Sequence, residues 1–323
     1  MNLLMISGKG AVDTALGKKN AFYNTLEELH GYFERIDIVC PKIQNPNAKV
    51  QIFGNVFFHS KVPDQKFDVV TVHEYAPFRN GRIANRIWEK GKIPMMFEIM
   101  HIPGMPRAGT WKERLAAIMT RFYIKYDTRH ASAVRVINSQ VGDWLVKAGV
   151  PRHKIKLVSA MYIDLEIFKP MNLEKKYDLI FVGRRATNKG IKLFEEAVEK
   201  LKAISYKLKA IVVDGWAKDS QEVATLINES KILVMPSYNE GGPRVVLEAL
   251  ACNVPVLATP VGIVPDVLPK EWIIDWSNDD IVKKARQILE HPPTTNLRAI
   301  AEPFEKKSAI KNYAEAILKV INI

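Results

Sequence analysis

The chain has 323 residues, 47% of them hydrophobic and 25% charged, and carries a net charge of +12. It is too long for one typical core and suits two globular domains of ordinary composition. No stretch approaches the roughly 18–20 apolar residues of a membrane span, and the first ten residues lack the basic segment of a signal peptide. Cys40 and Cys252 lie far apart in apolar surroundings, so free buried thiols and a cytoplasmic location are expected.

The positive charge is concentrated in the first half of the chain. Residues 1–160 hold 24 Lys and Arg against 13 Asp and Glu, a net of +11, whereas residues 161–323 have a net of +1. This asymmetry favours an anionic partner, either membrane lipid, a phosphorylated acceptor or nucleic acid. A basic surface that faces only solvent is the alternative.

In chain order, the first half alternates strand and helix patterns. Residues 3–7 form a short apolar run, and a loop with Gly8, Gly10 and Gly17 precedes a helix pattern that ends near residue 35. Because strands that alternate with helices favour a parallel sheet covered on both faces, this half is predicted to be a Rossmann-like domain. Further strands are predicted at 36–40, around 50–59, 68–73, 93–100 and 132–138, and further helices at 81–91 and 139–149.

A second α/β unit follows a domain boundary placed near residue 163. The expected domains are therefore 1–163 and 164–323, two Rossmann-like units that face each other across a cleft. The last helix, at about 306–321, is expected either to stay with the second domain or to pack back on the first domain. The second unit is predicted to contain strands at 178–183 and 209–213 and helices at 190–204, 219–228 and 279–290.

The most informative segment is residues 232–268, which read ILVMPSYNEGGPRVVLEALACNVPVLATPVGIVPDVL. An apolar strand enters a Glu-Gly-Gly-Pro loop, and a helix is predicted to begin at Pro243 with its free N–H groups facing that loop. Such a helix start binds anions, and Glu240 beside it is placed to accept hydrogen bonds from hydroxyls next to a phosphate. Phosphate with neighbouring hydroxyls describes a nucleotide sugar. A plain structural turn of a doubly wound domain is the alternative.

A second loop, in FVGRRATNKG, contains two cations five residues apart. Arg184 and Lys189 follow the strand that ends at Gly183, and they precede a predicted helix. Two cations in this arrangement can hold a diphosphate from two sides. Surface cations on an ordinary loop are the alternative, and Arg185 is the alternative to Arg184.

The two segments resemble the motifs of the retaining GT-B glycosyltransferases, the glycosyl transferases group 1 family (family 4). The string PSYNEGGPRVVLEALACNVPVLAT matches the family's donor-binding segment with its E-x7-E pair, and VGRRATNKG resembles its VGR-x4-KG motif. The likeness covers residues 130–270 well and 1–130 in outline. It implies an α/β fold of GT-B architecture and transfer of a hexosyl group from a UDP- or GDP-sugar to an acceptor hydroxyl. It implies no cofactor and no metal.

The resemblance also assigns roles to particular residues. Glu240 is expected beside the transferred sugar and Glu248 on the ribose hydroxyls, while Gly241 and Gly242 let the chain approach the ligand closely. His101 is expected across the cleft from the sugar, with a purely structural histidine as the alternative. His73, Glu74 and Gly17 are weaker candidates. The implied catalytic set is Glu240, His101, Arg184 and Lys189, and the implied donor-binding set is Gly8, Gly10, Gly183, Gly241, Gly242, Pro243, Arg244, Val245 and Glu248.

The chain departs from the family pattern at two places. Met161-Tyr162 stands where the family has Asn-Gly, and Val213-Asp214-Gly215-Trp216 stands where it has Gly-Asp-Gly-Pro. Recognition of the nucleotide base is therefore expected to be unusual near these positions.

Residues 107–130 form a basic amphipathic helix pattern. An apolar stripe consists of Trp111, Leu115, Ile118, Phe122 and Tyr126. Contact with an anionic membrane interface is one reading, and a stripe that faces the domain core is the other. The basic residues beside the stripe are Lys112, Arg114, Arg121, Lys125 and Arg129.

These observations favour a glycosyltransferase whose acceptor is unknown, with a lipid or glycan at the inner face of the membrane as one option. In the family-level mechanism the leaving diphosphate takes the acceptor proton, and Arg184, Lys189 and a helix dipole stabilise its charge. A glycoside hydrolase using Glu240 and Glu248 is one alternative. A basic nucleic-acid-binding protein is another, although no RNA-binding or zinc motif is present and nucleic acid is not expected as a partner.

Overall fold

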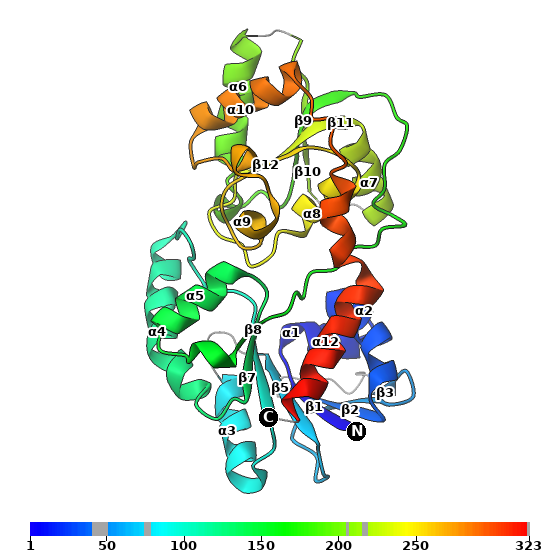
Figure 1. Cartoon of the computed structure of the whole chain (residues 1–323), viewed down its shortest axis with the longest axis vertical. Helices are drawn as coiled ribbons and strands as arrows, with labels where there is room; N and C mark the ends of the chain where they lie inside the picture. Colours follow the sequence, from blue (N-terminus) through cyan, green and yellow to red (C-terminus); the bar gives the residue numbers. More distant parts are fainter. Residues whose placement is uncertain (41–50, 74–78, 205–206, 215–218, 322–323) are drawn as a thin grey trace.

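The computed structural model describes residues 1–40, 51–73, 79–204, 207–214 and 219–321. Figure 1 shows two lobes, each built around its own sheet. The lobes have the α/β composition expected from the alternating patterns. None of the helices formed by the described residues has the length and apolarity needed to cross a bilayer.

The first lobe contains a sheet in the order β3-β4-β2-β1-β5-β6-β7-β8. Its strands pair in parallel, except that β3 runs antiparallel to β4. The segment expected to form one strand near 50–59 is thus a short pair of strands. The strands are β1 (Asn2–Ile6), β2 (Arg35–Val39), β3 (Gln51–Ile52), β4 (Val56–His59), β5 (Val69–His73), β6 (Met95–Ile99), β7 (Ala133–Val136) and β8 (Ile155–Leu157).

Helices cover both faces of this sheet because successive strand residues point to opposite sides. Leu3 and Met5 of β1 pack in the core under α1, α2 and α12, whereas Leu4 and Ile6 pack in the core on the other face. Buried residues of α3, α4 and α5 join that second core. The helices are α1 (Lys9–Ala15), α2 (Ala21–Leu29), α3 (Arg79–Gly91), α4 (Trp111–Asp127), α5 (Ser139–Lys147) and α12 (Lys306–Val320), with short 3-10 turns η1 (His30–Tyr32) and η2 (Arg152–Lys154).

The second lobe contains a parallel sheet in the order β10-β9-β11-β12. The apolar strands are buried within one continuous core. The strands are β9 (Tyr177–Val182), β10 (Ala210–Val213), β11 (Ser230–Met235) and β12 (Val256–Ala258). The helices are α6 (Ile191–Ile204), α7 (Ser220–Asn228), α8 (Arg244–Ala251), α9 (Val264–Val267), α10 (Asn278–Glu290) and α11 (Arg298–Ala301), with 3-10 turns η3 (Thr187–Lys189), η4 (Lys270–Trp272) and η5 (Glu302–Phe304).

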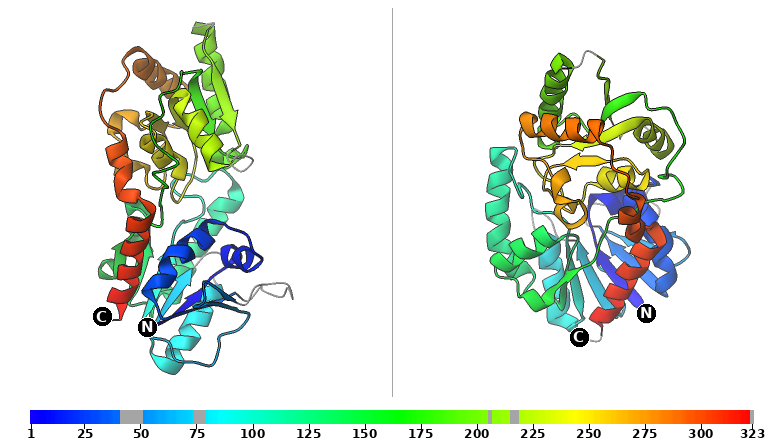
Figure 2. Two further views of the ribbon diagram at one scale, coloured as in Figure 1. Left: turned by 90° about the vertical axis from the view of Figure 1, so that its right-hand side faces the viewer. Right: turned by 45° about the horizontal axis from the view of Figure 1, so that its top comes forward.

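The chain passes between the lobes twice, and the two passages are bonded together. The N–H of Ile163 donates to the carbonyl of Phe304 at 2.8 Å, and the N–H of Lys306 donates to the carbonyl of Ile163 at 3.1 Å. After the second passage, α12 packs on the first lobe, where Tyr313 and Ile317 are buried in its core. Figures 1 and 2 show α12 running along the first lobe, where it packs against α2, β5 and β6.

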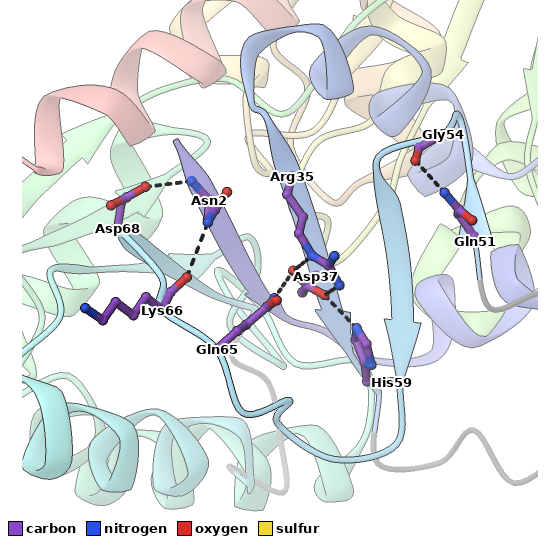
Figure 3. Close-up of polar contacts among 9 residues, drawn as sticks. All are labelled: Asn2, Arg35, Asp37, Gln51, Gly54, His59, Gln65, Lys66 and Asp68. Carbon is purple, nitrogen blue, oxygen red and sulfur yellow. Dashed lines mark hydrogen bonds and ion pairs between the residues drawn. The ribbon is translucent and has the colours of Figure 1, made fainter.

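A buried polar cluster holds β2 against β4 and is drawn in Figure 3. The Asp37 side chain is fully buried and accepts hydrogen bonds from Arg35 Nε at 2.8 Å and from Gln65, and it contacts His59 Nε2 at 2.7 Å. Burial alone raises the pKa of a carboxyl group. Hydrogen bonds from Arg35 and His59, together with the Arg35 charge, outweigh burial and lower the pKa of Asp37.

Two helix boundaries differ from the sequence-based expectation. Residues 9–15 are helical, so Gly10 lies in the first turn of α1 and not in an open loop. Its carbonyl accepts hydrogen bonds from Asn20 Nδ2 at 2.8 Å and Thr14 Oγ1 at 3.0 Å, which join α1 to the start of α2. The helix expected at Pro243 begins at Arg244, and Pro243 is its N-cap residue with an extended ψ of 95°.

Both cysteines are free and buried, as predicted. Burial raises the pKa of the Cys40 thiol and of the Cys252 thiol to about 12. Neither thiol is therefore a reactive thiolate at neutral pH.

Candidate functional site

The carboxyl ends of the parallel strands in the two lobes meet at one place. Met100 and His101 follow β6, Asn138 follows β7, and Gly241 lies in the loop after β11. Asn138 Nδ2 donates a hydrogen bond to the carbonyl of Gly241 at 2.6 Å. The residues at the ends of strands from the two lobes therefore form a common site, where open α/β sheets bind their ligands.

Glu240 and Lys189 form an ion pair at this site. Ser237 Oγ donates to the same Glu240 oxygen at 3.1 Å. Lys189 is held by the η3 turn, after which Gly190 adopts a left-handed φ of 70°. A Cβ at position 190 would clash with the carbonyl oxygen of Pro236, so glycine is required there. The cation of one loop is thus fixed against the carboxylate of the next.

His101 faces this ion pair from the first lobe. Burial lowers the pKa of His101, the negative charges of Glu240 and Glu113 raise it, and Lys189 lowers it, with a net downward shift. The imidazole is therefore neutral at neutral pH. A neutral ring can donate one hydrogen bond and accept another at the place expected for the transferred sugar.

The N-terminus of α8 lies directly after the Glu240 loop. Its N-cap residue Pro243 provides no side-chain hydrogen bond to the first turn, so the N–H groups of Arg244 and Val245 have no acceptor within the helix. Such N–H groups, aligned with the helix dipole, favour an anionic ligand.

Glu248 lies one turn into α8 and is half-buried. Burial raises the pKa of Glu248, and the positive charge of Arg244 partly offsets that rise. Arg244 Nε lies 4.0 Å from a Glu248 oxygen, is itself buried and has no hydrogen-bond partner within the described residues. The Arg244 guanidinium also lies 4.9 Å from the centre of the Tyr162 ring. Arg244 therefore packs partly against Tyr162, while 41% of its side chain stays exposed.

Gly241 and Gly242 also lie against protein atoms, which gives a second reason for glycine at these positions. A Cβ at position 241 would lie 2.6 Å from the carbonyl oxygen of Met100, and a Cβ at 242 would clash with the sulfur of Met161. The departure from the family pattern at Met161-Tyr162 has a structural role here, because Tyr162 also donates from its hydroxyl to the carbonyl of Ala21 at 3.0 Å.

Gly183 and Arg184 lie at the carboxyl end of β9. The N–H of Gly183 donates to the carbonyl of Val213 at 2.9 Å, which joins the ends of β9 and β10. Arg184 is exposed, and no ion pair involving it occurs among the described residues. Arg185 instead pairs with Glu195 of α6 at 2.8 Å. Of the two arginines, Arg184 is the one left available for a ligand.

The first-lobe candidates are placed less uniformly. Gly8 is the N-cap residue of α1 at the carboxyl end of β1, whereas Gly10 packs against α2. His73 lies at the end of β5, and burial lowers its pKa. Glu74, Gly215 and Trp216 lie outside the described residues.

Sequence reasoning missed the residues that join the lobes around the site. The Asp266 carboxylate accepts a hydrogen bond from the N–H of Ser139 at 3.0 Å and another from the Ser139 hydroxyl. The Glu113 carboxylate of α4 accepts from Asn239 Nδ2 at 3.1 Å, directly beside Glu240. Ser139 and Asn239 lie within four residues of the end of an apolar strand, whereas Glu113 and Asp266 lie in helices. Such positions do not identify the partner on the other lobe.

Comparison with known proteins agrees with this arrangement. Residues 215–316 match the family model described as Glycosyl transferases group 1. A Bacillus subtilis protein named for teichuronic acid biosynthesis, TuaC, is 37% identical over 106 residues, covering 28% of this chain and 26% of its own. A Campylobacter jejuni N,N'-diacetylbacillosaminyl-diphospho-undecaprenol alpha-1,3-N-acetylgalactosaminyltransferase is 23% identical over 176 residues, covering 44% and 46%. The chain therefore spans about half or less of the length of these relatives.

Solved structures share the fold over the whole chain. Sucrose-phosphate synthase from Thermosynechococcus elongatus superposes with a TM-score of 0.74 at 15% identity, covering 99% of both chains. The Anabaena protein HepE, solved in complex with UDP and glucose, superposes with a TM-score of 0.68 at 13% identity, covering 99% of this chain and 100% of its own. Residues 215–316 thus match the glycosyl transferases group 1 model, and the whole chain has the two-domain GT-B fold.

Proposed function

We propose that this protein transfers a sugar from a nucleotide-diphosphate sugar to an acceptor hydroxyl. The observation that carries the proposal is the Lys189–Glu240 ion pair, which lies at the uncapped start of α8 and faces the neutral imidazole of His101. Among the described residues, a cation, a carboxylate and two helix N-terminal N–H groups without a partner lie in one place, which suits a ligand that has both phosphate and hydroxyl groups.

The donor is expected to be a UDP- or GDP-sugar. Arg184 and Lys189 bind the diphosphate, Glu240 accepts hydrogen bonds from the sugar hydroxyls, and Glu248 accepts them from the ribose. The free N–H groups at Arg244 and Val245 supply further donors to phosphate or sugar oxygens. Support for a uridine nucleotide comes from the structure of HepE, which was solved in complex with UDP and glucose.

The reaction is proposed to retain the configuration at the sugar carbon and to need no metal. The acceptor oxygen forms a bond to that carbon as the bond to the β-phosphate oxygen breaks, and the departing phosphate takes the acceptor proton. The negative charge that develops on the phosphate is stabilised by Lys189, Arg184 and the α8 N-terminus. These groups carry the charge-neutralising role that a divalent cation has in other transferases.

The acceptor is proposed to be a lipid or glycan at a membrane surface, with the protein bound there peripherally. The net charge of +11 in residues 1–160 supports an anionic surface. The name of the Campylobacter relative, which contains a diphospho-undecaprenol group, supports a lipid-linked acceptor. A hydrolytic carboxylate pair is not favoured, because Glu240 is neutralised by Lys189 and Glu248 lies beside Arg244.

A donor-binding screen tests the proposal. Thermal denaturation is measured with a panel of UDP- and GDP-sugars, and one class is expected to raise the melting temperature. The Glu240→Gln variant is expected to keep its fold and lose at least about 100-fold in transfer rate, in line with removal of one preorganised polar group. Absence of stabilisation by every nucleotide sugar, or unchanged transfer by Glu240→Gln, contradicts the assignment.

A further inference from the structure

Helix α4 presents its apolar stripe to solvent. The exposed fraction is 70% for Trp111, 51% for Leu115, 55% for Ile118, 75% for Phe122 and 58% for Tyr126. These positions recur at intervals of three and four residues, so they share one side of the helix. Of the two alternatives for this stripe, a membrane interface or the domain core, the structure therefore excludes the core.

The opposite side of α4 is unusually polar for a buried face. The buried residues of the helix are Thr120, Ile124 and Asp127. A helix folded only for its own domain places its apolar face inward. Here the larger apolar side chains point outward, and contiguous exposed apolar surface of this kind marks an interaction site.

Positive charge flanks the exposed stripe. At about 100° per residue, Arg114, Arg121 and Lys125 lie on one side of it and Lys112 on the other. All four side chains are exposed. Aromatic and aliphatic groups bordered by Lys and Arg match the acyl–headgroup boundary of a membrane with negatively charged lipids. The same positive border disfavours a dimer formed through this face, because the basic residues of the two copies would repel each other.

The first turn of α4 reaches the donor loop. Thr110 and Glu113 form a capping box, and Glu113 also accepts a hydrogen bond from the N–H of Gly109 at 2.7 Å. The same Glu113 oxygen accepts from Asn239 Nδ2, next to Glu240. The exposed stripe and the candidate reaction centre are thus connected through one helix, and the residues of that connection lie at its N-terminal end.

We propose that the outward face of α4, defined as Trp111, Leu115, Ile118, Phe122 and Tyr126 with their basic border, docks on an anionic lipid bilayer. Docking sets the N-terminal end of α4 and the Glu240 loop close to the headgroups. Delivery of a membrane-borne acceptor to Glu240 depends on the proposed transferase function. Docking of α4 on the bilayer does not depend on it.

Vesicle co-sedimentation tests the docking. The full chain is mixed with vesicles of phosphatidylcholine alone or of phosphatidylcholine with phosphatidylglycerol. It is expected to pellet with the anionic vesicles and to be released as salt rises. Ile118→Ser is expected to weaken the partition at least about tenfold, because it removes an apolar side chain from the face that the bilayer would bury. Lys125→Glu is expected to weaken binding to the anionic vesicles.

Two matched controls lie on the second lobe. Ile204 of α6 is 57% exposed, so Ile204→Ser makes the same change at the same exposure and is expected to leave vesicle binding unchanged. Lys283→Glu, on α10, is the control for Lys125→Glu. The docking proposal is overturned if the supernatants of the neutral and the anionic vesicles contain equal amounts of protein. It is also overturned if Ile118→Ser binds as the wild type does, or if the protein self-associates without binding vesicles. Stabilisation of Ile118→Ser by nucleotide sugars is measured separately, so a failure of docking is distinct from a failure of the transferase assignment.

Discussion

Arg184 and Arg185 are neighbours in the sequence and differ in what they contact. Arg185 pairs with Glu195, while Arg184 is exposed without an ion pair among the described residues. We therefore expect Arg184→Met to weaken donor binding about 10- to 100-fold, the range for loss of a hydrogen bond to a charged group. Arg185→Met is expected to change it less than threefold, because exposed ion pairs contribute little. Calorimetric titration with the donor compares the two, and equal losses contradict the assignment.

Glu248, the residue proposed to bind the ribose, is expected to lower the stability of the unliganded fold. Because burial raises its pKa, the charged form is disfavoured in the folded chain, and stability falls as pH rises through the raised pKa. Glu248→Gln is expected to raise the melting temperature at pH 7 and to weaken donor affinity about tenfold.

The matched control for Glu248→Gln is Glu290→Gln. Glu290 is 57% exposed and pairs with Arg286 on the surface of α10 at 3.3 Å. That variant is expected to change neither the melting temperature nor the donor affinity. A lower melting temperature for Glu248→Gln contradicts the burial argument.

Motif spacing identified the chemical groups of the candidate site but not their mutual contacts. The E-x7-E and VGR-x4-KG patterns indicated Glu240 and Lys189 because each pattern follows a strand end. The ion pair between them joins residues 51 positions apart, and its geometry depends on how the two loops pack. The glycines at 241 and 242 were predicted to let a ligand approach, and the sequence did not indicate that they also lie against Met100 and Met161.

At the scale of elements, the direction of the α4 stripe could not be predicted. A helical repeat of apolar residues reads the same whether the stripe faces a core or a membrane. The first helix was also missed, because Gly8, Gly10 and Gly17 suggested a loop. In the structure, side-chain hydrogen bonds from Thr14 and Asn20 stabilise residues 9–15 as a short helix against α2.

Asp127, at the end of α4, gives the helix a pH-dependent stability. Its side chain is buried, its Oδ2 has no hydrogen-bond partner within the described residues, and burial raises the pKa of Asp127 from 3.8 to about 6. A carboxylate at a helix C-terminus is also disfavoured by the helix dipole. Stability is therefore lost as pH rises from about 4 to 6 and stays low above that range.

Asp127→Asn is expected to stabilise the protein by up to about 3 kcal/mol at pH 8, since one pKa unit corresponds to about 1.4 kcal/mol. The gain is expected to disappear near pH 4, where Asp127 is protonated. Urea denaturation at the two pH values measures it. The exposed Asp143, which pairs with Arg152 at 2.8 Å, provides the control Asp143→Asn, with a change within about 0.5 kcal/mol. Equal gains at pH 4 and pH 8 contradict the explanation.

At the scale of the whole molecule, the two-sheet organisation followed from the alternation of strand and helix patterns. Those patterns are local, whereas the contacts that bring the lobes together join residues more than 100 positions apart. The Asn138–Gly241 and Ser139–Asp266 hydrogen bonds are of this kind. No periodicity encodes such pairs, so a cleft between two domains could be expected from the sequence, but the contacts that join the lobes could not.

Asp266 is positioned to hold the lobes together. Its carboxylate lies at the N-terminus of α5, where it accepts from the N–H and hydroxyl of Ser139 and interacts favourably with the helix dipole. Gln140 Nε2 adds a hydrogen bond to the carbonyl of Pro260 at 2.9 Å. Because Asp266 belongs to neither donor motif, its removal changes the closure of the lobes without removing a group expected to touch the donor.

Asp266→Ala is expected to enlarge the radius of gyration of the unliganded protein in X-ray scattering, because fewer bonds favour the closed arrangement. Apparent donor affinity is expected to fall about fivefold, since a smaller population of the closed state reduces affinity in proportion. Saturating donor is expected to restore the wild-type radius. Asp279→Ala is the control, because Asp279 is 79% exposed and pairs with Lys200 within the second lobe. If Asp266→Ala scatters as the wild type does and binds donor equally well, the Asp266–Ser139 hydrogen bonds do not control closure of the two lobes.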